Sequence, residues 1–224
     1  WNVFDFKILT FISASCLIGI AILFYQSILE KQKAMLFLII VILVFQFQYY
    51  NSVLLPSDAL YSTCTIFYVF CSLYFLNNRS TRMFILSLFC VLLAALNCGS
   101  GFAGLIAGML MLITQKRTKH LFVWLIFSVC ISTLFFIDYA LIHENVFSSG
   151  NIPTLFNRIL KCAVFSFAFL GSPFQFLYQI VLPIIGGAIV WMFFFFLTLK
   201  KYYKKNPIIY FMLIFLIICS CFPS

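Results

Sequence analysis

The chain has 224 residues, of which 65% are hydrophobic, 20% aromatic and 8% charged. Soluble domains carry about 25% charged residues, so this composition excludes an ordinary soluble domain, a disordered chain and a small disulfide-stapled domain. The net charge of +9 does not point to nucleic acid, because Lys and Arg beside apolar segments mark the topology of a membrane protein. We expect an all-α integral membrane protein that contacts the lipid bilayer and binds no nucleic acid.

Eight apolar segments approach the length of a membrane span, for which about 20 residues are needed. In chain order they are 8–25, 35–50, 59–76, 83–96, 102–114, 121–137, 176–199 and 207–222. The stretch 83–114 is interrupted at 97–101 and is compatible with two short spans or with a re-entrant hairpin. We therefore expect one integral membrane domain over 1–224, a polytopic helical bundle with about eight crossings, between about seven and nine.

Most positive residues lie in short connections between these segments, and Lys and Arg gather in the short cytoplasmic loops of membrane proteins. These residues are Lys31, Lys33, Arg79, Arg82, Lys116, Arg117, Lys119, Lys200, Lys201, Lys204 and Lys205. All of these residues can lie on the same side of the membrane only if the chain crosses it twice, not three times, between residues 120 and 200. We therefore expect an interfacial or re-entrant helix near 154–170 on the far side, together with the break at 97–101.

The nine cysteines are scattered and form neither a CxxC pair nor a Cys/His spacing of a metal site. Most lie inside apolar segments, where a free cysteine behaves as a small hydrophobic residue. The sequence therefore predicts no disulfide framework and no metal-ligand set. Whether the function uses a divalent metal stays open.

Polar side chains near the far ends of the segments are candidates to line a cavity, because amides and hydroxyls at membrane depth need partners. For the residues at 46–51 the alternative is hydrogen bonding between helices and a belt of interfacial tyrosines. The break at 97–101 has two interpretations as well. It is either a helix start that offers N–H groups to an anion, or a tight turn whose glycines let helices approach closely. The cavity candidates are Gln48, Tyr49, Asn51, Asn97, Ser100, His143 and Ser172.

Three acids on the expected far side are candidates for catalysis. Asp138 and Glu144 lie with His143 in a polar stretch expected to begin directly after the segment 121–137. Two carboxylates and an imidazole are sufficient for general base chemistry, but charged residues are also ordinary in loops. Asp58 follows Pro56 and is either a third candidate acid or the N-cap of the next helix.

Arg158 and Lys161, along with Lys7, depart from the one-sided distribution of the positive residues. Arg158 and Lys161 are three residues apart and so share one face of a helix. Cations at this place fit either a phosphate or pyrophosphate group or simple snorkelling of the side chains to the interface. We treat both residues as candidates for phosphate and lipid-carrier binding.

Three short motifs occur in order over residues 45–174: Phe45–Asn51, Leu96–Gly101 and Phe167–Pro173. With them the chain resembles a loosely described family of bacterial polytopic membrane proteins. That family is itself similar to the lipid-carrier-dependent (C-type) glycosyltransferases of the cell envelope. The resemblance implies a multi-pass protein of the bacterial cytoplasmic (inner) membrane. Its donor would be a sugar on polyprenyl phosphate, and its acceptor a glycan or lipid outside the cytoplasm.

In such enzymes the base is usually an acid in the first outer loop. The sequence begins at Trp1 without a Met, and we expect it to be a piece of a longer chain that begins after that loop. No residue here is therefore carried over as that base, and Asp138 and Glu144 are the remaining candidates. Two alternatives stay open: an O-antigen-type polymerase or ligase, and a non-enzymatic flippase or transporter. A proton-coupled carrier needs ionisable residues within its spans, whereas the charges here lie mostly at segment ends.

Overall fold

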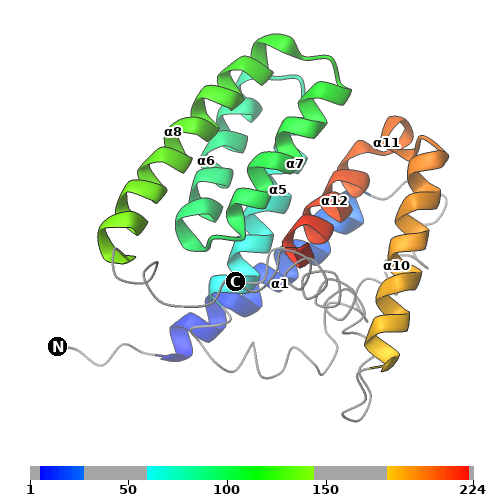
Figure 1. The fold of residues 1–224 in the computed structure, drawn as a ribbon, viewed down its shortest axis with the longest axis horizontal. Coiled ribbons are helices and arrows are strands. Elements are labelled where there is room, and N and C mark those ends of the chain that lie inside the picture. Colours follow the sequence, from blue (N-terminus) through cyan, green and yellow to red (C-terminus); the bar gives the residue numbers. More distant parts are fainter. Residues whose placement is uncertain (1–5, 28–59, 144–180, 222–224) are drawn as a thin grey trace, which may run out of the picture.

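A computed structural model describes residues 6–27, 60–143 and 181–221 of the chain (Figure 1). Every regular element in these three ranges is a helix, which confirms the all-α class. The elements are α1 (Phe6–Ser27), η3 (Leu60–Cys64), α5 (Thr65–Asn77), α6 (Thr81–Asn97), α7 (Gly101–Thr114), α8 (Thr118–His143), α10 (Val181–Leu199), α11 (Tyr202–Lys205) and α12 (Pro207–Cys221). The expected segment 35–50 and the helix near 154–170 lie outside these ranges.

Helices α5 to α8 run up and down beside one another and form the main bundle (Figure 1). Short connections join them, because Ser80 and Cys98 take extended backbone conformations that end the helical path. The interior of the bundle is apolar and closely packed. Its fully buried side chains include Val69, Leu73, Val91, Met111 and Trp124.

Helices α12 and α1 complete the core on one side of α5. The ring of Phe70 meets Phe24 of α1 at a centroid distance of 5.3 Å and Phe215 of α12 at 5.9 Å, both edge to face. Helix α10 stands beside α11 and α12 (Figure 1). Its Phe194 ring stacks on Tyr210 with the centroids 5.4 Å apart.

The ends of two helices differ from the sequence expectation. The polar stretch expected to begin at 138 begins inside α8, which continues to His143. Neither Gly nor Pro occurs between Asp138 and His143, so nothing in the local sequence breaks the helical hydrogen-bond ladder there. The basic connection before α12 also contains a short helix, α11, where a plain loop was expected.

One described helix is long and apolar enough to cross a membrane, over Thr118–Phe135. Only 11% of this window is buried in the structure, so most of its side chains lie on the outside of the described bundle. The shorter apolar helices are Phe11–Ser27, Thr81–Asn97, Gly101–Thr114, Gly187–Leu199 and Pro207–Cys219. The number of crossings therefore stays a prediction.

Candidate functional site

Four of the candidate site residues fall within the described ranges: Asn97, Ser100, Asp138 and His143. For Asp138 and His143 the structure gives the helix position but no side-chain surroundings. The other candidates lie outside the described residues. They are Asp58, Glu144, Arg158, Lys161, Gln48, Tyr49, Asn51 and Ser172.

Asp138 and His143 are positions of helix α8 rather than of a loop. Positions five apart on a helix do not share a face, since neighbours on the surface are three or four apart. Helix geometry therefore separates these two positions around α8. Since a helix rises about 1.5 Å per residue, Asp138 lies about 30 Å along α8 from Thr118, which matches the hydrocarbon thickness of a bilayer, about 30 Å.

The Asn97 side chain ties the end of α6 to the start of α5. Its Nδ2 donates to Thr65 Oγ1 at 2.8 Å and to the carbonyl oxygen of Tyr61 at 3.3 Å. The Thr65 hydroxyl donates to the same Tyr61 carbonyl. That carbonyl lies in the π-helical turn η3, a distortion that frees a backbone acceptor and often occurs at functional sites. Asn97 thus joins two helices by side-chain hydrogen bonds.

The break at 97–101 is a tight turn between two helices. The amide groups of Gly101, Phe102 and Ala103 donate to the carbonyls of residues 98, 99 and 100 at 2.8, 3.2 and 3.1 Å. A Cβ on Gly101 would lie 2.2 Å from the carbonyl oxygen of Ala94, so only glycine permits this approach of α7 to α6. The first three N–H groups of α7 are therefore paired within the turn rather than free for an anion.

The polar site that sequence reasoning missed lies at the opposite end of the bundle, around Arg117. Its Nη1 donates to the carbonyl oxygen of Leu76 at 2.8 Å, and Nη1 and Nη2 each donate to that of Asn78 at 3.2 Å. Nη1 also donates to Gln115 Oε1 at 3.3 Å. The guanidinium therefore caps the C-terminal end of α5. In the sequence Arg117 was only one of several topology signals.

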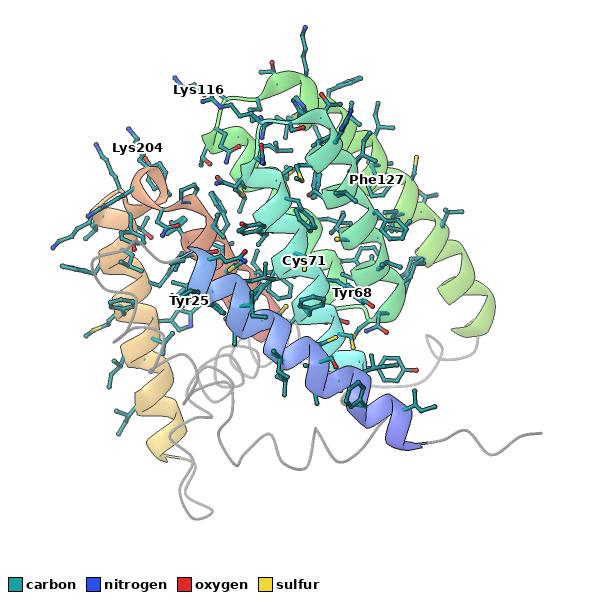
Figure 2. All side chains as sticks on the ribbon, turned by 180° about the vertical axis from the view of Figure 1, so that it is seen from behind. Tyr25, Tyr68, Cys71, Lys116, Phe127 and Lys204 are labelled. Carbon is teal, nitrogen blue, oxygen red and sulfur yellow. The ribbon has the colours of Figure 1, made fainter. Side chains whose placement is uncertain are left out.

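Positive charge is concentrated at this end. Figure 2 shows Lys116 and Lys204 projecting at the same end of the molecule, although they belong to different connections. Burial and, next, the positive charge of nearby Arg79 lower the pKa of Arg117. The exposed cations at this end are Arg79, Arg82, Lys116, Lys119, Lys200, Lys201, Lys204 and Lys205. The described ranges contain one acid, Asp138, far along α8.

Two buried thiols meet where α1 crosses η3. The sulfurs of Cys16 and Cys64 are 3.3 Å apart, and both cysteines are free. Among the described residues no group of three or more His, Cys, Asp or Glu side chains is placed to hold a metal ion. This pair is a packing contact between two helices, and spacing along the sequence gave no sign of it.

Compared with protein families, with curated proteins and with solved structures, the chain matches none of them.

Proposed function

We propose that the chain is a multi-pass membrane protein of the bacterial cell envelope whose basic end faces the cytoplasm. The observation that carries this proposal is a surface with apolar helix sides and one strongly basic end. Large apolar side chains are exposed along α8 and α10, among them Phe122, Ile126, Val129, Ile189 and Phe193. Exposure of such a surface to water is energetically unfavourable, whereas lipid tails would cover it.

The one-sided charge supports the same orientation. Connections that lie far apart in the sequence carry their cations at one end of the molecule, as Lys116 and Lys204 illustrate (Figure 2). Lys and Arg in short loops mark the cytoplasmic side. The turn at Cys98–Ser100 joins α6 to α7 at the end of the bundle that is opposite the basic end. Asp138 is also separated from the basic end, by the length of a membrane span. The proposed far face therefore holds the only acid of the described ranges.

We further propose that the protein takes part in sugar transfer from polyprenyl phosphate to an acceptor on the non-cytoplasmic face. The resemblance over 45–174 and the placement of Asp138 support this activity. The acceptor hydroxyl would attack the anomeric carbon, and a carboxylate, Asp138 or Glu144, would take its proton. The bond from that carbon to the phosphate oxygen breaks, and its electron pair stays on polyprenyl phosphate. Arg158 and Lys161 would stabilise the charge of the departing phosphate.

The topology is tested by single cysteines in a background without the native ones. Gly99, Thr118 and Lys204 are exposed positions and each is replaced by Cys. We expect Gly99→Cys to react with an impermeant maleimide on intact cells, and Thr118→Cys and Lys204→Cys to react only after permeabilisation. Reaction of Thr118→Cys and Lys204→Cys from opposite sides would contradict the proposed threading. A further variant, Ser172→Cys, tests whether the segment after 170 is on the far side.

The activity is tested by complementing a deletion strain with variants of the full-length protein and analysing its envelope glycans. We expect the deletion to lose one sugar substituent. Asp138→Asn and the double variant Arg158→Ala with Lys161→Ala should fail to restore it. The control is Cys130→Ser, an exposed position on the same helix as Asp138, which should restore it fully. Full restoration by Asp138→Asn would remove Asp138 from the mechanism, and unchanged transfer by the double variant would remove the phosphate role.

A further inference from the structure

Two neighbouring turns at the basic end carry four exposed cations. Arg79 lies in the connection from α5 to α6, and Arg82 lies in the first turn of α6. Lys116 lies in the connection from α7 to α8, and Lys119 lies in the first turn of α8. We call these four residues the two-turn patch. No ion pair to any of them is formed within the described ranges, whose single acid is Asp138.

Arg117 holds the two turns together. It belongs to the second turn, and its guanidinium binds the carbonyl oxygens of Leu76, at the end of α5, and of Asn78, in the first turn. A second bridge runs from Gln115 Nε2 to Asn77 Oδ1 at 3.3 Å. The cations of the patch are therefore brought together before any ligand binds, which lowers the cost of binding an anion. Arg117 itself is engaged with backbone oxygens and is not counted in the patch.

Apolar side chains are exposed directly beside the patch. One turn after Arg82 are Ile85 and Leu86, and one turn after Lys119 is Phe122, and all three are exposed. A ligand that covers both surfaces must combine an anionic head with an apolar body. A nucleic acid or an acidic peptide would use only the charged part and leave these side chains in water.

We propose that the two-turn patch binds the phosphate headgroup of an anionic phospholipid of the cytoplasmic leaflet, with its acyl chains along the outer sides of α6 and α8. The inference rests on the proposed membrane embedding and not on the proposed sugar transfer. Each Lys or Arg near a lipid surface attracts anionic headgroups. The attractions of the four cations in the patch add together. The clamp by Arg117 makes this patch a defined site rather than diffuse charge.

The same end supplies a matched comparison. Lys200, Lys201, Lys204 and Lys205 are four further exposed cations, and within the described residues the Arg117 clamp does not reach their connection. Lys200 is engaged locally, with its Nζ 4.3 Å from the centre of the Phe196 ring. Replacing either set of four by Gln removes the same charge from the same end of the molecule.

The test is native mass spectrometry of the detergent-purified chain with phosphatidylglycerol or phosphatidylcholine. We expect one phosphatidylglycerol to be retained, phosphatidylcholine to be lost, and affinity to fall about tenfold or more when the two-turn patch is neutralised by R79Q, R82Q, K116Q and K119Q. The variant with K200Q, K201Q, K204Q and K205Q should retain the lipid. Equal losses in both variants, no loss in the two-turn variant, or equal retention of phosphatidylcholine would each overturn the proposal.

Two controls separate the causes of failure. Inorganic phosphate, compared with sodium chloride at equal ionic strength, should not displace the lipid, and selective displacement by phosphate would show a site for free phosphate instead. Extraction of membranes with alkaline carbonate tests the embedding by itself. Release of the wild-type chain by carbonate would overturn the membrane proposal. A chain that stays in the membrane but retains no lipid would overturn only the patch.

Discussion

The indole ring of Trp124 fills the space that a side chain on Gly108 would need. A Cβ at position 108 would lie 2.3 Å from Trp124 Cζ2. Trp124 is fully buried, and its Nε1 donates to the carbonyl oxygen of Leu105 at 2.9 Å. Tryptophan, the largest side chain, therefore packs directly against the backbone of Gly108. This contact determines how closely α7 and α8 approach each other.

We expect Gly108→Ala to lower the free energy of unfolding by about 1–3 kcal/mol, because an added methyl group forces the buried indole or the helix to move. The measurement is the midpoint of thermal unfolding in detergent. The control is Gly99→Ala, since a Cβ at position 99 meets no atom within 4 Å. Equal stability of the two variants would contradict the α7–α8 packing.

Replacing Arg117 by Lys should destabilise the protein although the charge is unchanged. A lysine ammonium lacks the planar fork that reaches the carbonyls of Leu76 and Asn78 together. We expect a loss of about 1–3 kcal/mol, typical of a hydrogen bond from a charged group that is removed. The matched variant is Arg79→Lys, at an exposed position of the neighbouring turn. A capping role for Arg117 requires that only the first variant lose thermal stability.

Asn206 should be needed for the attachment of α1. Its side chain is 6% exposed, and Nδ2 donates to the carbonyl oxygen of Ser27 at 2.9 Å. Asn206→Leu leaves that buried carbonyl at the end of α1 without this partner, so we expect a loss of about 1–3 kcal/mol. Hydrogen exchange should rise in α1 more than in α7. Unchanged protection of α1 would refute the attachment.

The contact between Cys16 and Cys64 can be trapped by oxidation. Molecular iodine, which enters apolar interiors, should join the two sulfurs while two protons and two electrons leave the thiols and iodine is reduced to iodide. Proteolysis without reductant, followed by mass spectrometry, should give one linked peptide pair. The pair should vanish in Cys64→Ser and persist in Cys130→Ser, because Cys130 is exposed on α8. A linkage of Cys16 to Cys130 instead would contradict the fold.

Local sequence patterns were sufficient for the helical class, the separate helices before and after the break at 97–101, and the grouping of Lys116 with Lys204. Apolar length, turn residues and charge act over a few residues, so they can be recognised without the fold. The same patterns misjudged the end of the helix at Asp138. A charge in the sequence suggested a loop, but helix propagation continued to His143 because no breaker occurs before it.

Only the tertiary structure decided which partners the polar and small residues have. Arg117 reaches Asn78 across 39 positions and Asn206 reaches Ser27 across 179. Gly108 faces Trp124 because α7 and α8 pack at one particular rotation. Such pairings depend on how helices are packed and turned against one another, and a helix with apolar residues on all sides gives no face to predict that rotation. The sequence by itself determined the helical class and the apolar segments of this protein, whereas packing determined which residues are in contact.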